Sequence, residues 1–195
     1  MQISIIGTGN VGSVLARRCA ELGHGVTTAN SSTERAQVAR DAGAADVVVL
    51  AVPYDAVAGL DAQIKAALAG KVVIDATNPL AADFLSLTVG HTTSGAERNA
   101  EALPGARLVK AFNMVLAANQ NTGTLKGAAL FLPVVGDDQD AKETVIELAS
   151  RLGFDAVDAG PLSNARYTEP VAELLIQLAY GSGMGTGIGL GLLRG

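Results

Sequence analysis

A glycine-rich turn follows the first apolar run of the sequence, Ile3-Ser4-Ile5-Ile6. It reads Gly7-Thr8-Gly9-Asn10-Val11-Gly12, which has the spacing G-x-G-x-x-G. In that spacing the first glycine permits a tight turn out of a strand, the second lets the backbone approach a pyrophosphate, and the third lets the next helix pack closely on the sheet. The N-terminus of that helix directs unpaired N–H groups and a partial positive charge at the diphosphate. Since a second strand follows within about 30 residues, the context favours a nicotinamide dinucleotide site over a turn without a ligand.

The residues after the second expected strand, Gly25 to Ala29, discriminate between the two nicotinamide cofactors. An NAD site usually has Asp or Glu there, which accepts a hydrogen bond from the ribose 2′-hydroxyl. This chain instead has Asn30, Ser31 and Ser32, and Arg35 follows in the next expected helix. Hydroxyl and amide donors together with a guanidinium suit a 2′-phosphate, so the sequence favours NADP over NAD. The alternative for Arg35 is a solvated surface charge.

Three further segments are expected beside the cofactor, because ligands of open α/β sheets lie at the carboxyl ends of the strands. They are Val52-Pro53-Tyr54, Asn78-Pro79 and Phe112-Asn113. Asn78 and Asn113 are each able to bond a carboxamide or a ribose. Turn formation, for which Asn is well suited, is the alternative for both.

Buried runs alternate with helical stretches along the chain, the pattern of a parallel sheet covered by helices on both faces. The predicted fold class is therefore α/β: a Rossmann-type, doubly wound, mostly parallel sheet with a small C-terminal helical, glycine-rich segment. We expect residues 1–158 to form the NAD(P)-binding domain and residues 159–195 the C-terminal segment. Strands are expected at 3–6, 25–29, 46–52, 71–76, 107–112, 130–135 and 155–158, and helices at 11–22, 33–42 (capped by Ser32 or Thr33), 54–68, 96–103, 141–152 and 168–180.

Composition excludes several other classes of protein. The net charge is −5 and no Lys/Arg cluster is present, which argues against nucleic-acid binding. The single cysteine, Cys19, allows no intrachain disulfide, and with only His24 and His91 beside it no metal site is expected. No catalytic triad or carboxylate pair is evident, so no catalytic side chain is predicted. The N-terminal residues do not resemble a signal peptide, and a cytoplasmic location is expected.

The end of the chain is apolar and rich in glycine. Residues 174–193 carry no formal charge and have the length of a membrane span. Glycine at every second position from Gly181 to Gly191 opposes a helix, at about 1 kcal/mol for each glycine relative to alanine. We therefore expect a buried, tightly packed segment rather than a membrane helix.

The order of the motifs resembles one family of oxidoreductases. The motifs are Gly7 to Gly12, Val52-Pro53, Asn78-Pro79, Lys110-Ala111-Phe112-Asn113, Val135-Gly136-Asp137-Asp138 and Asp158-Ala159-Gly160-Pro161-Leu162. Over nearly the whole chain they resemble the NADPH-dependent F420 reductases, also called 8-hydroxy-5-deazaflavin:NADPH oxidoreductases. The same order is similar to the oxidoreductase domain of the STEAP metalloreductases, which pass hydride from NADPH to a flavin.

The resemblance implies direct hydride transfer between NADP(H) and F420, with FMN or FAD as alternative second cofactors. Thr8, Gly9, Asn10 and Val11 match the phosphate loop of the family. Asn30 and Ser31 match a Ser-Arg pair at the 2′-phosphate, and Arg35 matches a Lys one turn later, so one family cation is lost at Ser31. Archaeal members have His in place of Asn113, which leaves the identity of the second cofactor open.

A pocket for the second ring is expected after Phe112 and at the C-terminal segment, which would complete this pocket or a dimer interface. The candidate lining residues are Met114, Val115, Leu116, Ala117 and the region around Met184, with core packing or a subunit contact as the alternative. A homodimer is expected to cover the apolar tail.

Two other functions are compatible with the dinucleotide site. One is an NADP-dependent reductase of a small carbonyl or imine substrate, but such enzymes usually have a long helical second domain and only about 35 residues follow Gly160. The other is a non-catalytic NADP sensor, which would bind the cofactor without turnover.

Overall fold

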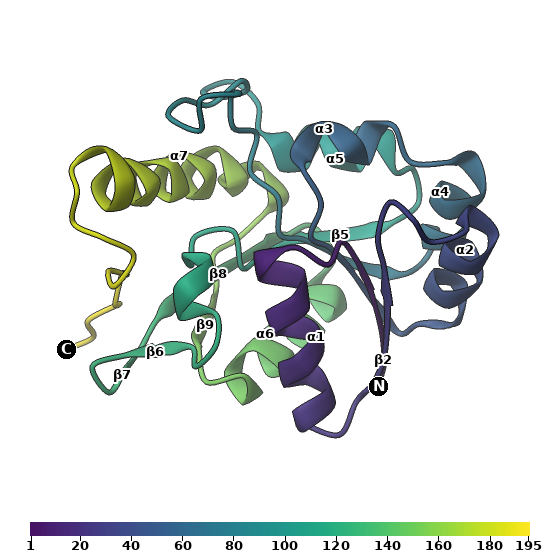
Figure 1. Ribbon diagram of the computed structural model, residues 1–195, viewed down its shortest axis with the longest axis horizontal. Coiled ribbons are helices and arrows are strands. Elements are labelled where there is room, and N and C mark those ends of the chain that lie inside the picture. Colours follow the sequence, from purple (N-terminus) through teal and green to yellow (C-terminus); the bar gives the residue numbers. More distant parts are fainter.

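The predicted strands assemble into one seven-stranded sheet in the order β2-β1-β3-β4-β5-β8-β9 (Figure 1). The computed structural model describes residues 1–195. All neighbouring strands are parallel except β5 and β8, so β8 and β9 run opposite to the other five. The strands are β1 (Gln2–Ile6), β2 (Gly25–Ala29), β3 (Val47–Leu50), β4 (Val72–Asp75), β5 (Arg107–Lys110), β8 (Phe131–Gly136) and β9 (Asp155–Asp158). The doubly wound, mostly parallel α/β fold expected from the sequence is confirmed.

Seven α-helices flank this sheet, and several short elements connect them. The helices are α1 (Asn10–Glu21), α2 (Arg35–Ala44), α3 (Tyr54–Ala58), α4 (Ala62–Leu68), α5 (Gly95–Ala102), α6 (Gln139–Arg151) and α7 (Ala165–Ile176). The short elements are η1 (Ala117–Asn119), β6 (Thr124–Leu125), β7 (Ala128–Ala129), η2 (Leu162–Asn164) and the π-helical turn η3 (Gln177–Gly181).

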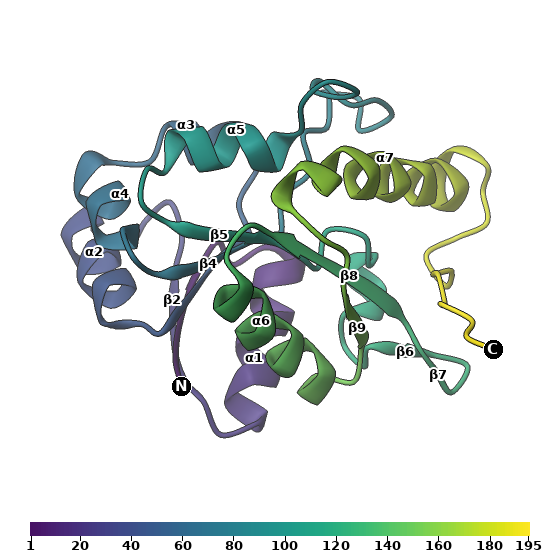
Figure 2. The same cartoon turned by 180° about the vertical axis from the view of Figure 1, so that it is seen from behind.

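The side chains of each strand alternate between two cores, one on each face of the sheet. In β3, Val47 and Val49 belong to the core that includes residues of α1 and α6, whereas Val48 and Leu50 belong to the core that includes residues of α2, α4 and α5. Figure 2 shows α1 and α6 on one side of the sheet and α3, α5 and α7 on the other. Because both faces are covered, β3 is a continuous apolar run, and β4 is apolar up to its last residue, Asp75.

Two predicted helix boundaries were wrong. The helix expected over 54–68 is divided into α3 and α4, because Asp61 accepts a hydrogen bond from the Gln63 N–H and begins a new helix. Neither Ser32 nor Thr33 caps α2. The helix begins only at Arg35 without a side-chain cap, since Thr33 Oγ1 instead accepts from the Asn30 N–H.

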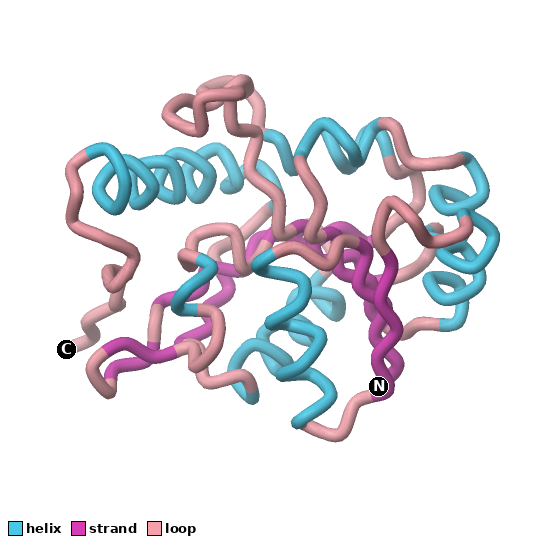
Figure 3. Tube along the Cα trace, in the orientation of Figure 1, coloured by secondary structure: helices cyan, strands magenta, loops and turns pink.

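Contrary to the expectation, the glycine-rich tail, residues 181–195, is not buried. Residues 181–195 are exposed apart from Thr186 and Ile188, which are half-buried, and Leu193 is 96 % exposed. The segment runs as a coil from the end of α7 toward the β6–β7 hairpin (Figure 3). It is held there by Asn119, which donates to the backbone oxygens of Thr186 and Ile188, and by a hydrogen bond from the Phe131 N–H to Leu190. No helix of the structure has the length and apolar character needed to cross a membrane.

The motifs Gly136-Asp137-Asp138 and Asp158-Ala159-Gly160-Pro161-Leu162 bond to one another and fix the chain before α7. Asp138 caps α6 through the Ala141 N–H and receives two hydrogen bonds from the Arg107 guanidinium. Asp137 accepts from the Leu162 N–H, and Lys142 pairs with Asp158 at 2.8 Å. The Gly-Asp-Asp and Asp-Ala-Gly-Pro-Leu motifs are thus explained by structure, because they join the end of β8 to the chain that leads into α7.

Asp138 makes the stability of the fold depend on pH at the acidic limit. Hydrogen bonds from Arg107 and from the Ala141 N–H lower the pKa of Asp138 to about 2, against about 3.9 in an unfolded chain. The unfolded state therefore binds more protons between these values, and the contribution to the free energy of unfolding is lost as pH falls from about 4 to about 2. The variant Asp138→Asn keeps a capping acceptor but has no carboxyl group to protonate. Its free energy of unfolding, measured by denaturant titration, should therefore fall less than that of the wild type between about pH 4 and about pH 2. Parallel losses in the variant and the wild type would contradict this assignment.

Candidate functional site

The three glycines of the turn after β1 have different surroundings. Gly7 has a φ of +110°, and a Cβ there would lie 2.2 Å from the Ala51 backbone oxygen. A Cβ at Gly12 would lie 1.9 Å from the Gly7 backbone oxygen, whereas a Cβ at Gly9 would have nothing within 4 Å. Packing thus explains Gly7 and Gly12, while Gly9 faces open space. Gly9 is also the N-cap of α1 and offers no side chain to the first N–H groups of that helix.

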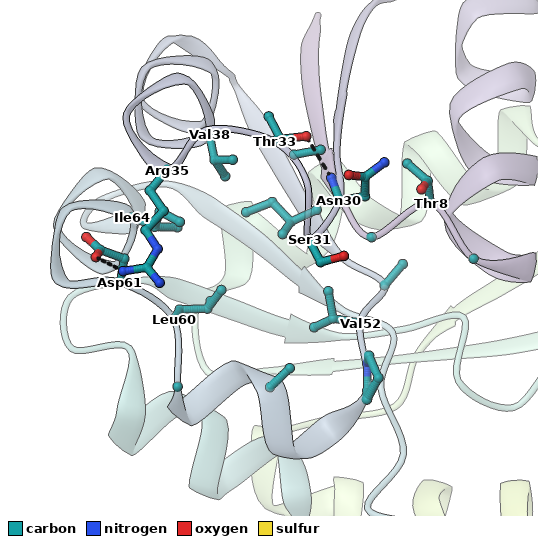
Figure 4. A pocket seen from close by; sticks show the side chains of 18 residues that line it. Thr8, Asn30, Ser31, Thr33, Arg35, Val38, Val52, Leu60, Asp61 and Ile64 are labelled. Atoms are coloured by element: carbon teal, nitrogen blue, oxygen red, sulfur yellow. Dashed lines mark hydrogen bonds and ion pairs between the residues drawn. The ribbon is translucent and has the colours of Figure 1, made fainter.

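A first cavity of about 750 Å³ extends from this turn to α2 and α4. Figure 4 shows its uncharged polar side chains, Thr8, Asn30, Ser31 and Thr33, on one side. The apolar Leu60 and Ile64 lie on the other side, together with the charged Arg35 and Asp61. The size is that of a typical small-ligand site. Eight of the predicted cofactor residues line this cavity: Gly7, Thr8, Gly9, Asn30, Ser31, Arg35, Val52 and Pro53. Four other predicted residues line neither this cavity nor the next one: Gly12, Ser32, Tyr54 and Pro79.

Local hydrogen bonds close the segment after β2 into a turn. Asn30 Oδ1 accepts from the Ser32 N–H at 2.9 Å, and Thr33 Oγ1 accepts from the Asn30 N–H at 3.0 Å. Such turns are the ordinary use of Asn and Thr after a strand. Here they hold the backbone so that Ser31 and Arg35 both border the cavity.

The far end of the first cavity carries an ion pair that the sequence analysis missed. Arg35 lies 3.3 Å from Asp61, whose other carboxylate oxygen caps α4. The Arg35 side chain is 79 % exposed and that of Asp61 25 %. The sequence analysis placed Asp61 inside a continuous helix. Gly59 and the capping residue Asp61, two positions later, together indicated that the helix breaks there.

A second cavity of about 540 Å³ lies on the other side of the glycine turn. Its lining is mainly apolar and comes from the start of α1, the end of β4, the loop after β5, α7 and the segment 80–85. The lining includes the predicted residues Asn10, Val11, Asn78, Phe112, Asn113, Met114, Val115, Leu116 and Ala117. Met184 is not among them and is 60 % exposed, while Phe84, Leu85, Ile176 and Tyr180 were not predicted.

The loop after β5 is held rigidly against the second cavity. Phe112 is buried with a φ of +66°, a conformation that is strained for a bulky residue. Gln120 donates to the backbone oxygens of Phe112 and Val115. Asn78 and Asn113 are bonded reciprocally, because each side-chain amide donates to an oxygen of the other residue at 3.0 Å. Asn113 Oδ1 is buried without a partner.

A buried charged cluster lies beneath this loop. The Lys110 ammonium lies 3.2 Å from Asp75 and 2.9 Å from Glu169, and all three side chains are at most 1 % exposed. Glu169 also accepts from the N–H groups of Gly95 and Ala96 at the start of α5. Burial alone would lower the pKa of Lys110, but the two carboxylates outweigh it and raise that pKa. The cluster therefore joins β4, β5 and α7 through the Lys110 ammonium, and α5 through the Glu169 carboxylate.

The single cysteine and the residue types that bind metals lie apart from the two cavities or from one another. Cys19 is buried in α1, and desolvation raises the pKa of its thiol to about 11, so it is a core residue as predicted. No group of three His, Cys, Asp or Glu side chains is placed to hold a metal ion.

A glycine turn at the point where the strand order reverses, with cavities on both sides, defines a dinucleotide-binding protein of the Rossmann class. A family model described as NADP oxidoreductase, coenzyme F420-dependent, matches residues 2–79. The F420-dependent NADP reductase of Methanothermobacter marburgensis is 34 % identical over 212 residues, covering 91 % of this chain and 92 % of that protein. The chain belongs to the family of F420-dependent NADP reductases, which confirms the resemblance inferred from its motifs.

A solved structure and a second curated protein are also similar to the chain. A crystal structure of a protein from Arthrobacter sp. FB24, assigned as an F420-dependent NADP reductase, superposes with a TM-score of 0.87 at 28 % identity and covers all of both chains. The metalloreductase STEAP3 of Rattus norvegicus is 31 % identical over 189 residues, covering 90 % of this chain. This chain spans only 37 % of the length of STEAP3.

Proposed function

We propose that this protein transfers a hydride directly between NADP(H) and the deazaflavin F420. The observation that carries the proposal is the position of the glycine turn between two cavities, with Gly9 lining the first and Asn10 the second. A dinucleotide with its diphosphate at the N-terminus of α1 has its adenosine half in the first cavity and its nicotinamide half in the second. The names of the relatives support the same pair of ligands.

In this proposal the first cavity selects the cofactor. The backbone of Thr8, Gly9, Asn10 and Val11 holds the diphosphate, and Val52 and Pro53 contact the adenosine half. Asn30, Ser31 and Arg35 bind the 2′-phosphate, for which the guanidinium is the one cation on the cavity wall. Gly12 contributes by allowing α1 to approach the sheet.

The second cavity brings the two rings together. When bound, the nicotinamide and the second ring supply the hydride donor and acceptor, so no nucleophile or metal is required. Phe112, Met114 and Ala117 exclude water and hold the rings in contact. Asn113 Oδ1, which is buried and unpartnered, is the acceptor assigned to the carboxamide, and the Asn78 amide holds the Asn113 backbone in place. Pro79 directly follows Asn78 in the chain.

An ordinary flavin is the second candidate acceptor, because STEAP3 is a relative. The resemblance of the motifs supports it too, since it implies that archaeal members have His in place of Asn113 and that the STEAP metalloreductases pass hydride to a flavin. The deciding experiment mixes the pure protein with NADPH and, separately, with F420, FMN and FAD, and follows the loss of NADPH absorbance. Turnover with F420 alone supports the proposal, and turnover with FMN or FAD assigns a flavin instead. Binding of NADPH without turnover on any acceptor would indicate a sensor.

The selectivity for NADP can be tested at Arg35. Arg35→Ala should weaken NADPH binding by about tenfold to a hundredfold, the range expected for a charge-assisted hydrogen bond, with NADH nearly unaffected. Dissociation constants from NADPH and NADH fluorescence titrations measure both effects. Arg40→Ala removes the same charge from the same helix outside the cavity and serves as the control. An equal loss for the two cofactors would remove the 2′-phosphate role of Arg35.

The proposed assembly is a homodimer that acts in the cytoplasm. Exposed apolar side chains on α7 and the tail support the dimer, among them Tyr167, Leu174, Tyr180 and Leu193. Sedimentation of the pure protein measures this directly, and a monomer at micromolar concentration would overturn it.

A further inference from the structure

The charges at the far end of the first cavity cancel one another. Among the cavity-lining residues only Arg35 and Asp61 are charged, and they are paired at 3.3 Å across the cavity edge (Figure 4). The turn after β2 has the uncharged Ser31 beside the cavity and offers no second cation. A site with one neutralised guanidinium offers a phosphate dianion much less attraction than a free guanidinium does.

We propose that Asp61 is a specificity-determining residue that lowers the preference of this site for NADP over NAD. The inference rests on the proposed function, because it assumes that the adenosine 2′-position lies near Arg35. The Asp61 carboxylate acts in two ways: it occupies the guanidinium that a 2′-phosphate needs, and it repels the phosphate itself. Neither effect applies to the uncharged 2′-hydroxyl of NAD. The acid that limits NADP binding thus comes from the turn between α3 and α4 rather than from the end of β2.

Asp61 is positioned firmly enough for this role. One carboxylate oxygen accepts from the Gln63 N–H at 2.9 Å, which fixes the side chain at the N-cap of α4, and the other faces Arg35. Helices α2 and α4 pack against each other through the core that contains Val38 and Ile64. Asp61 is the N-cap of α4 and Arg35 is the first residue of α2, so the packing of these two helices fixes the backbone at both charges.

The test is the variant Asp61→Asn, which removes the charge but keeps an oxygen able to cap α4. The measured quantity is the NADH dissociation constant divided by the NADPH dissociation constant, both from cofactor fluorescence. This ratio should rise by about fivefold in favour of NADPH, the range expected for release of an exposed ion pair. Asp55→Asn, an equal charge change on α3 outside the cavity, should leave the ratio unchanged. In an Arg35→Ala background the effect of Asp61→Asn should shrink, because only the direct repulsion remains.

The outcomes separate this inference from the proposed function. If the wild type binds neither NADPH nor NADH, the proposed function fails. If the wild type binds both and Asp61→Asn leaves the ratio unchanged or shifts it toward NADH, only the role of Asp61 is overturned. A shift of the same size in Asp55→Asn would also overturn it, since general charge would then be the cause.

Discussion

Replacement of Gly9 by Ala is expected to reduce dinucleotide binding by about a hundredfold, about 2.7 kcal/mol, while the protein stays folded. An added Cβ has nothing within 4 Å in the unliganded protein, and Gly9 has an ordinary negative φ of −72°. The methyl group would therefore occupy only the space that the diphosphate needs. Because Ala is a poor N-cap, a loss of about 1 kcal/mol in the free energy of unfolding is expected from α1.

Two other glycines serve as matched controls for this result. Gly43→Ala places a Cβ in ordinary contact, 3.8 Å from Ala67, within α2 and should leave binding unchanged. Gly12→Ala places one 1.9 Å from a backbone oxygen and should lower both stability and binding. Calorimetric titration and thermal unfolding of the three variants check the pattern. Normal binding by Gly9→Ala would mean that no diphosphate approaches this turn.

Removal of the Lys110 ammonium is expected to have the largest effect on stability. Lys110→Met leaves the carboxylates of Asp75 and Glu169 buried without a counter-charge, which typically costs about 3–5 kcal/mol. The damage should extend to the second cavity, because Glu169 precedes Ala172 and Ile176, which line that cavity from α7. Denaturant unfolding measures the loss, and the KM for the second substrate reports on the cavity.

A triple variant makes this second prediction specific. Asp75→Asn and Glu169→Gln, combined with Lys110→Met, remove all three charges and should recover part of the lost stability. Recovery is partial because each amide keeps only one of the two oxygens that accept from buried N–H groups in the wild type. Recovery would assign the loss to uncompensated charge. A stable Lys110→Met protein, or a triple variant no more stable than the single one, would contradict the account of the cluster.

The sheet and the phosphate turn could be predicted because local sequence determines them. Apolar runs such as Val47 to Leu50 have no alternative to a covered strand, and the second strand, Gly25–Ala29, was placed with its observed limits. Gly7 and Gly12 were assigned to turn and packing roles that their contacts explain.

The missed features depend on contacts between residues far apart in the chain. Lys110 and Asp75 each lie at the last position of a strand, and only the pairing of β4 with β5 and the docking of α7 reveal them as one cluster with Glu169. Asp61 meets Arg35 because α2 packs on α4. The tail was predicted to be buried because it is apolar, whereas Leu193 is 96 % exposed. Apolar composition does not determine which surface, if any, a segment packs against.

The most direct test of the account is calorimetric titration of the pure protein with NADP and with NAD. We expect saturable binding of one molecule per chain, tighter for NADP, with a dissociation constant on the order of micromolar. Absence of saturable binding for both cofactors up to millimolar concentration would contradict the assignment of the glycine turn to a dinucleotide diphosphate.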